Sequence, residues 1–366
     1  MTDIADMKLS ADQLARSSGR IDRLRQRLAA EGHSAMIIDH EIDIWYLTGF
    51  VGHDATLVIT TDVAAILCDA RYEEYLRPWK DGGVHEVHIG PRQELVRRIR
   101  EVAQACDVGT FAFQAEHMTV ARLQQFRSQL EGIDFISSHG HLLALRMIKD
   151  DHEVGIIEHC IDIQQRALHA SFEQLERGMT ESGFTAILEF EMRKLGATGA
   201  GFDPIVASGP NSSVIHHMPC ERPIGDGPLL VDWGARYDGY CSDMTRTFQI
   251  GPADAKMAQL YDIVLRSQLA AIEACRPGAD CAEVDAAARR RVVTARDGVD
   301  ERIFILAIGH AVAVGVCFAR VRVDTLIEGA IAAKLRGVVD AVAVGVCVVR
   351  VGPELSFDGI RQAVAV

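Results

Sequence analysis

The chain has 366 residues, of which 48% are hydrophobic and 24% are charged, and its formal net charge at pH 7 is -13. This length predicts two domains, and the negative charge argues against binding to nucleic acid or to an anionic membrane surface. A polar start, and the interruption of the longest apolar stretch by His310, argue against secretion and membrane insertion. Nine cysteines without a CxxC pair indicate reduced thiols, so we expect a cytoplasmic protein.

The first part of the chain alternates between short apolar runs and charged amphipathic runs. The apolar runs predict strands at residues 35–38, 56–60, 64–68 and 110–113. The amphipathic runs predict helices at residues 18–30, 71–79, 94–106 and 119–130. This alternation predicts an α/β domain over residues 1–145.

The remaining residues, 146–366, have a different order of elements. Two helices are expected first, at residues 153–176 and 181–195, with Thr180 as the cap of the second. After Gly-rich strands, two more helices are expected at residues 253–275 and 281–295, with strands again from residue 303. The repeated order favours an internally duplicated α+β domain, although capped helix pairs are common enough for coincidence to be the alternative.

Two aspartates flank a predicted β-hairpin in the segment LLVDWGARYDGYCSDMTRTF. Its apolar runs are joined by Asp238-Gly239, a dipeptide typical of tight hairpin turns. If the turn centres just before Asp238, Asp232 lies directly opposite Asp243. If it centres one residue later, the two aspartates are diagonal neighbours. In both alignments their side chains share a face and lie roughly 5 to 8 Å apart.

Two carboxylates this close repel each other unless a cation lies between them or one of them stays protonated. Carboxylate oxygens suit divalent ions such as manganese, cobalt or zinc. The alternative is two solvated aspartates beside an ordinary hairpin, with Arg246 as a local counter-charge. The histidines favour the metal site. His216 and His217 lie in a polar loop suited to acid–base chemistry, and His310 could donate a nitrogen ligand.

Several motifs taken together resemble the pita-bread metallopeptidases, a family that includes Xaa-Pro aminopeptidases, prolidases and metal-free creatinases. In the first domain these motifs are IWYLTGFVGHDATLVI and CDARY. In the second they are RMIKDDHEVGIIEHC, GFDPIVASGPNSSVIHHMP and LLVDWGARYDGYCSDMTRTFQIG. The resemblance implies an α+β chain with a creatinase-type α/β N-terminal domain over residues 1–145. An internally duplicated pita-bread catalytic domain would follow over residues 146–366.

The resemblance also implies a role for each candidate residue. The ligands of a divalent-metal centre, with manganese expected and cobalt or zinc as alternatives, would be Asp232, Asp243 and His310. His216 would hydrogen-bond the scissile carbonyl or shuttle a proton, while His217 and Arg350 would contribute to substrate binding. A metal-bound hydroxide would attack the peptide bond before proline. The expected partners are small proline-containing peptides and a second copy of the chain in a homodimer.

The C-terminal residues depart from the family pattern. Leu335 and Gly352 occupy the positions where the family has glutamate ligands. The three remaining ligands would under-coordinate two ions, so one weakly held ion is the more natural expectation. The segment AVAVGVC occurs at residues 311–317 and again at 341–347. Three explanations are open. The segment has degenerated after loss of metal binding, or its sequence is unreliable because of a frameshift or poorly determined residues, or it is a repeated β-ribbon with a new purpose. The first two are favoured.

Three functions follow from these observations. The leading hypothesis is metal-dependent hydrolysis of Xaa-Pro peptide bonds by a dipeptidase or aminopeptidase. The second is a catalytically impaired homologue that binds peptides or partners, and the missing glutamates favour it. The third is a metal-free creatinase-like amidinohydrolase that relies on His216. The aspartate pair speaks against this third hypothesis, because close carboxylates are unfavourable without a cation.

Overall fold

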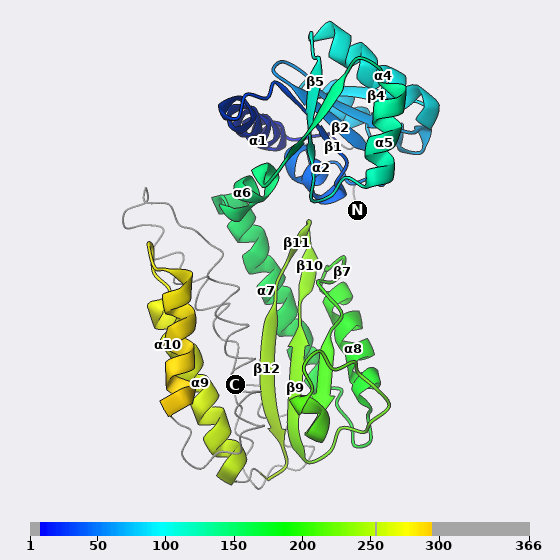
Figure 1. Cartoon of the computed structure of the whole chain (residues 1–366). Coiled ribbons are helices and arrows are strands. Elements are labelled where there is room, and N and C mark those ends of the chain that lie inside the picture. Colours follow the sequence, from blue (N-terminus) through cyan, green and yellow to red (C-terminus); the bar gives the residue numbers. More distant parts are fainter. Residues whose placement is uncertain (1–7, 253–254, 295–366) are drawn as a thin grey trace. The chain divides into compact units, whose positions relative to one another are not determined.

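The computed structural model describes residues 8–252 and 255–294. The chain divides into two compact units, Met1–Met147 and Ile148–Val366, whose elements are labelled in Figure 1. Among the described helices, none combines the length and the apolar character that a membrane span requires.

The first unit is built on a six-stranded mixed sheet with the order β4-β3-β2-β1-β5-β6. The pairs β1–β2 and β2–β3 are antiparallel, whereas the other three pairs are parallel. The four strands predicted from apolar runs are all present. The strands are β1 (Ala35–Ile38), β2 (Thr56–Thr60), β3 (Ala64–Cys68), β4 (Glu86–Ile89), β5 (Thr110–Gln114) and β6 (Asp134–Ser138).

Helices cover both faces of this sheet. Leu24 and Leu28 of α1 pack with one set of strand residues, and Ile99 of α4 and Phe126 of α5 pack with the other set. Figure 1 shows α1 on one side of the sheet and α4 and α5 on the other. The helices are α1 (Ala11–Ala30), α2 (Glu41–Thr48), α3 (Arg77–Asp81), α4 (Arg92–Ala105), α5 (Val120–Gln129) and α6 (His141–Met147).

The predicted helix at residues 71–79 is wrong. The chain instead forms a short 3-10 helix at Ala70–Tyr72, and α3 then begins one residue before Pro78. Proline lacks a backbone N–H, so it is tolerated at the start of a helix but not in its interior. The strands β4 and β6 were not predicted. They are the two edges of the sheet and are partly exposed, so they lack the apolar runs of the central strands.

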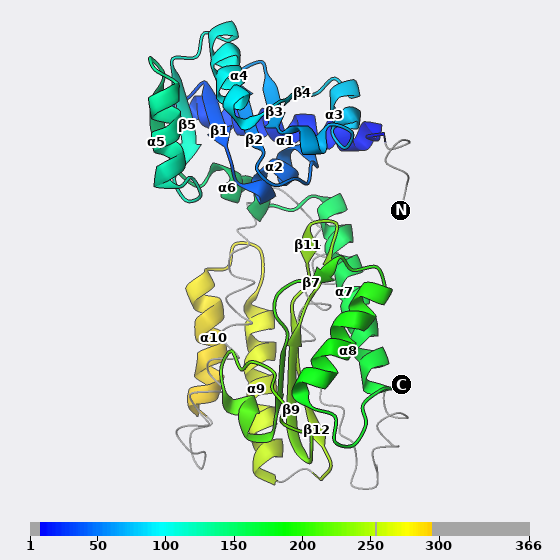
Figure 2. The same ribbon diagram turned by 90° about the vertical axis from the view of Figure 1, so that its right-hand side faces the viewer.

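The second unit begins with two helices that the sequence predicted. In α7 (Asp151–Phe172), Asp150 and Glu153 form a reciprocal capping box. In α8 (Glu181–Lys194), the Thr180 side chain accepts a hydrogen bond from the backbone N–H of Gly183. Both helices contribute to one apolar core with the strands that follow, and Figure 2 shows them together on one side of β9 and β12.

The strands of the second unit form two antiparallel three-stranded sheets, with the orders β11-β10-β7 and β12-β9-β8. Their bounds are β7 (Gly199–Ala200), β8 (Ile205–Ser208), β9 (Gly227–Trp233), β10 (Ala235–Tyr237), β11 (Tyr240–Cys241) and β12 (Met244–Ile250). The long pair β9–β12 carries the predicted hairpin, and the short pair β10–β11 forms its tip.

A second helix pair follows, as the predicted duplication requires. Helices α9 (Ala255–Ala274) and α10 (Cys281–Thr294) pack through Ala271, Val284 and Ala288. Asp280 caps α10, because its Oδ1 accepts a hydrogen bond of 2.6 Å from the backbone N–H of Ala282. The strands predicted from residue 303 lie outside the described residues.

Candidate metal and catalytic site

The hairpin places Asp232 on β9 and Asp243 directly before the neighbouring strand β12. Asp232 on β9 pairs with Thr245 on β12, and Tyr237 pairs with Tyr240 around the Asp238-Gly239 turn. The turn therefore centres one residue later than a direct Asp232–Asp243 pairing would require. Of the two predicted alignments, the structure has the diagonal one, which keeps both carboxylates on the same face.

A glycine makes the close approach of these strands possible. Gly234 directly follows the last residue of β9, and a Cβ atom at this position would lie 2.0 Å from the carbonyl oxygen of Ser242. No side chain fits at that distance. Because Gly234 lies two residues after Asp232, and Ser242 directly precedes Asp243, this contact fixes the two strands where the aspartates are attached.

The surroundings of Asp232 disfavour its charged form. Its Oδ1 atom is buried and has no hydrogen-bond partner among the described residues. Burial, with a further contribution from the charge of Asp243, raises the pKa of Asp232 from 3.8 to about 6, although a hydrogen bond with Thr245 opposes the shift. Desolvation also raises the pKa of Asp243, even though this residue keeps an exposed surface. A bound cation would offset both effects.

Arg246 is not placed as the expected counter-charge beside Asp232. It pairs with Val231, one position from the Asp232–Thr245 pair, so its side chain leaves from the opposite face of the strands. The buried Arg246 side chain donates a hydrogen bond of 3.0 Å from Nη1 to the carbonyl oxygen of Thr245.

The two predicted loop histidines have different surroundings. His216 is exposed and has a φ of 56°, a left-handed conformation that is uncommon outside glycine. The side chain of His217 is only 13% exposed, and its Nε2 lies 2.7 Å from Oε2 of Glu181. His217 therefore anchors the loop, while His216 remains open to solvent.

Glu181, at the start of α8, is the centre of this anchor. Its Oε1 accepts hydrogen bonds from the backbone N–H of Ser208 at 2.7 Å and from the side chain of Asn211 at 3.0 Å. Its Oε2 accepts a hydrogen bond from Nε2 of His217. It also accepts two hydrogen bonds from Cys220, one from the backbone N–H and one from the thiol, each at 3.2 Å. Burial alone would raise the pKa of Glu181, but these hydrogen bonds outweigh burial and lower it.

Neither Glu181 nor Cys220 was predicted as a site residue. Glu181 shows in the sequence only as an acidic residue in the first turn of a helix. Its partners Ser208, His217 and Cys220 are 27, 36 and 39 residues further along the chain. No local spacing rule connects residues that far apart, so only the fold brings them together.

Two of the predicted site residues cannot be placed. His310, the predicted nitrogen ligand, and Arg350, a predicted substrate-binding residue, lie outside the described residues. The same holds for Leu335 and Gly352, which occupy the positions of the expected glutamate ligands. The structure thus describes the aspartate half of the predicted metal centre and the loop of His216.

A second buried carboxylate with histidines lies in the first unit. The side chain of Asp43 is 1% exposed, and its Oδ2 lies 2.8 Å from Nδ1 of His40 and 4.0 Å from Nε2 of His117. The rings of His40 and His117 stack with their centroids 3.6 Å apart. Arg146 reaches Oδ1 of Asp43 at 3.0 Å, so a guanidinium group already balances this carboxylate.

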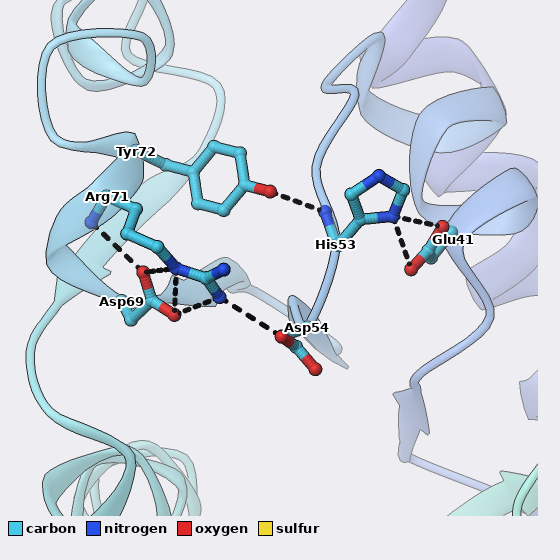
Figure 3. A network of polar contacts seen from close by, with 6 residues as sticks. All are labelled: Glu41, His53, Asp54, Asp69, Arg71 and Tyr72. Carbon is cyan, nitrogen blue, oxygen red and sulfur yellow. Dashed lines mark hydrogen bonds and ion pairs between the residues drawn. The ribbon is translucent and has the colours of Figure 1, made fainter.

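A polar network joins the two motifs of the first unit on which the family resemblance rests (Figure 3). Arg71 forms ion pairs with Asp69 at 2.6 Å and with Asp54 at 3.0 Å. The backbone N–H of His53 donates to the Tyr72 hydroxyl at 2.9 Å, and the His53 ring contacts Glu41. The Arg71 side chain is 61% exposed, so this network ties two loops together at the surface.

Two family models match the chain. The model described as metallopeptidase family M24 matches residues 155–330, and the creatinase/prolidase N-terminal domain matches residues 20–148. The first match contains Asp232, Asp243 and His310, and it ends before Leu335 and Gly352.

Known proteins with similar sequences and structures carry peptidase names. The uncharacterized peptidase YqhT of Bacillus subtilis (strain 168) is 29% identical over 274 residues, which are 75% of this chain and 77% of that protein. The Xaa-Pro dipeptidase of Pyrococcus furiosus is 33% identical over 196 residues, which are 53% of this chain and 56% of that protein. The solved structure of a Xaa-Pro dipeptidase from Bacillus anthracis superposes with a TM-score of 0.72 at 28% identity, covering 77% of this chain and 79% of that one.

Proposed function

Because the chain belongs to metallopeptidase family M24 and carries a creatinase/prolidase N-terminal domain, we propose that it is a divalent-metal-dependent peptidase that hydrolyses Xaa-Pro bonds. The observation that carries the proposal is the aspartate pair, with Asp232 on β9 and Asp243 directly before β12. Asp232 has a buried oxygen without a partner among the described residues, and its pKa is raised to about 6. The names of similar proteins support Xaa-Pro peptides as the substrates.

The donor set fits a divalent ion. Asp232 and Asp243 offer oxygen ligands from one face, and His310 would add a nitrogen ligand from outside the described residues. Oxygen with one nitrogen suits manganese, with cobalt or zinc as alternatives. An ion bound there would lower the pKa of a water molecule and offset the negative charge that develops on the peptide carbonyl.

The proposed acid–base residue is His216. An imidazole changes charge near neutral pH, so a ring nitrogen of His216 can hold a proton toward the scissile carbonyl or pass it on. Its neighbour His217 is held by the buried Glu181 carboxylate, which fixes the loop one residue after His216. His217 and Arg350 remain our proposed substrate-binding residues.

The test is an assay of the purified protein after chelation and reloading with manganese, cobalt or zinc. We expect release of the N-terminal amino acid from Xaa-Pro peptides and much slower release from matched Xaa-Ala peptides. Asp232→Asn should lower kcat/KM by at least about a hundredfold, because it removes a metal ligand. Asp238→Asn removes the same charge from the exposed turn of the same hairpin and should leave kcat/KM unchanged. Protein that holds no metal and releases no amino acid would refute the proposal.

A second candidate function rests on the sequence at Leu335 and Gly352. These residues cannot ligate a metal as the glutamates of the family do, which favours a homologue that binds peptides without hydrolysing them. Calorimetry with a proline-containing peptide distinguishes the two functions. Binding without turnover, unaffected by a chelator, would support this second function, whereas metal-dependent turnover would exclude it.

We also propose that the protein is a homodimer, as the family resemblance implies. The mass of one chain is 40.1 kDa, so sedimentation equilibrium should return about twice this value. A mass equal to that of one chain across the micromolar range would contradict the proposal.

A further inference from the structure

The anchor of the His216 loop has the composition of a metal site. Glu181, His217 and Cys220 offer an oxygen, a nitrogen and a sulfur atom that all lie within 4.8 Å of one another. Thiolate and imidazole together favour zinc and similar ions over magnesium or calcium. We propose that these three residues bind a zinc-type divalent ion at a site separate from the Asp232–Asp243 pair.

The distances require only a small adjustment. Oε2 of Glu181 lies 2.7 Å from Nε2 of His217 and 3.2 Å from Sγ of Cys220. Tetrahedral ligands of zinc, at roughly 2.0 to 2.3 Å from the ion, lie about 3.3 to 3.8 Å apart. Oε2 of Glu181 therefore needs to move away from the other two donors by about half an ångström, while Nε2 of His217 and Sγ of Cys220 already lie within 4.8 Å of each other. The ion would replace the hydrogen bonds that now converge on Oε2.

The carboxylate is already oriented as a ligand. The Glu181 side chain is fully buried, and its Oε1 is held by the backbone N–H of Ser208 and by Asn211. Hydrogen bonds of this kind to the distal oxygen commonly fix a ligating carboxylate. Oε2, which lies next to His217 and Cys220, remains the oxygen that would coordinate the ion.

The positive end of α8 is offset by the loop itself. The backbone N–H of Glu181 donates to the carbonyl of Arg222 at 3.0 Å, and that of Ser182 donates to the carbonyl of Cys220 at 3.1 Å. These carbonyls satisfy N–H groups that would otherwise repel a cation at the helix start. The cluster of Asp43, His40 and His117 is less suited to a cation, because the guanidinium of Arg146 already forms an ion pair with the Asp43 carboxylate.

Binding changes the protonation of two ligands. The Cys220 thiol loses its proton to the buffer and binds as thiolate, and His217 binds through Nε2 while its remaining proton moves to Nδ1. The three protein ligands leave a fourth position for water. Because Cys220 is exposed, the site can be reached from solvent.

The site lies next to the proposed acid–base residue. Coordination would draw the His217 ring out of its hydrogen bond with Glu181 and shift the backbone that carries His216. This consequence rests on the proposed peptidase function: zinc should inhibit a manganese-loaded enzyme, and Cys220→Ser should relieve the inhibition. The existence of the site does not depend on activity and is tested separately.

Cobalt serves as the spectroscopic probe for the site. Titration of the full chain with Co²⁺ should produce a near-ultraviolet thiolate-to-cobalt charge-transfer band that Zn²⁺ removes. Cys220→Ser should abolish the band. Cys241→Ser, which removes an exposed thiol close to Asp243, and Asp232→Asn should both keep it. A band that persists in Cys220→Ser, or its absence from the wild-type protein, would overturn the proposal.

A labelling experiment checks the same proposal without a substitution. Iodoacetamide alkylation followed by peptide mass spectrometry reports each thiol of the wild-type protein. Zn²⁺ should slow alkylation of Cys220 at least about tenfold, because a coordinated thiolate is a poorer nucleophile. The exposed Cys281 should react at the same rate with and without zinc. Equal rates at Cys220 would contradict the site, whether or not the protein proves to be a peptidase.

Discussion

Asp232 on β9 and Glu181 at the start of α8 are two carboxylates of the same unit that are both withdrawn from solvent, yet their surroundings are opposite. Asp232 has a buried oxygen without a partner in the described part of the chain, and its pKa is raised to about 6. Glu181 is fully buried and accepts hydrogen bonds on both oxygens, and its pKa is lowered. Burial by itself therefore does not decide the charge of a carboxylate in this protein.

The two carboxylates differ in how much each would gain from a bound cation. Several hydrogen-bond donors favour the anionic form of a carboxylate, whereas burial and a neighbouring carboxylate disfavour it. At Asp232 the single hydrogen bond with Thr245 does not offset these two effects. Asp232 is therefore the carboxylate whose charged form a bound cation would stabilise most. Glu181 is already stabilised by its hydrogen bonds, and an ion there would have to compete with His217 and Cys220 as hydrogen-bond donors. We therefore expect a divalent ion to bind more tightly at the Asp232–Asp243 pair than at Glu181, provided that the remaining ligands of the aspartate pair are supplied.

The largest effect on stability is expected from Glu181→Ala. The substitution leaves the donors of Ser208, Asn211 and Cys220 without their acceptor, so the free energy of unfolding should fall by about 3 to 5 kcal/mol. Urea denaturation followed by circular dichroism measures this change. Glu189→Ala, on the same helix, is the control and should change stability by less than about 0.5 kcal/mol. If the free energy of unfolding fell by a similar amount in both variants, Glu181 would contribute no more to stability than an ordinary residue of the helix.

Asp232, whose pKa is raised, is expected to make the protein less stable as the pH rises. Its pKa is raised from 3.8 to about 6 in the folded protein, so the folded state binds this proton more tightly than the unfolded chain. The stabilising contribution is complete below the unfolded pKa and is lost as the pH rises through the folded value. With a chelator present, the wild-type protein should lose on the order of 2 to 3 kcal/mol across this range that Asp232→Asn does not lose.

Urea denaturation at a series of pH values between 4 and 7 tests this expectation as a difference between variants. Asp238→Asn, in the exposed turn, should keep the wild-type pH profile. Glu181 should act in the opposite direction, because its lowered pKa gives stability that is lost as the pH falls. Identical slopes for the wild type and Asp232→Asn would show that Asp232 is not destabilised by burial.

A third effect is expected from the strand contact that positions the aspartates. In Gly234→Ala the new Cβ would meet the Ser242 carbonyl, so the strands must separate at a cost of about 2 kcal/mol. The variant should also retain less metal during dialysis, because Asp232 and Asp243 are close in the chain to Gly234 and Ser242. Gly225→Ala is a matched control, since nothing lies within 4 Å of a Cβ at that position. Wild-type stability and metal retention in Gly234→Ala would contradict the role of this contact.

The smallest effect is expected from the helix cap beside Glu181. Thr180→Ala removes the hydrogen bond to the N–H of Gly183 and should lower stability by about 1 kcal/mol. The cobalt band proposed for Cys220 should remain, because Glu181 keeps its own donors. Thr119→Ala removes the equivalent cap of α5 in the first unit and should cost a similar amount. A larger loss in Thr180→Ala than in Glu181→Ala would reverse the comparison.

Much of the fold could be predicted from local patterns. The apolar runs of β1, β2, β3 and β5 and the Thr180 cap of α8 are visible in the sequence, because each depends on neighbouring residues. The edge strands β4 and β6 were not visible, since partly exposed strands lack an apolar run. The prediction of one helix across Pro78 was wrong, because proline lacks a backbone N–H and is therefore tolerated only at the start of a helix.

The candidate site divides in the same way. That Asp232 and Asp243 share a face follows from the amino-acid sequence, because the Asp-Gly turn and the two-residue period of strands relate positions eleven residues apart. The choice between the direct and the diagonal pairing required the three-dimensional structure. The contact of Glu181 with His217 and Cys220 also depends on that structure, because packing α8 against the loop brings together groups separated by 36 and 39 residues. Spacing rules reach as far as one hairpin or one helix, and contacts beyond that range depend on how the elements pack.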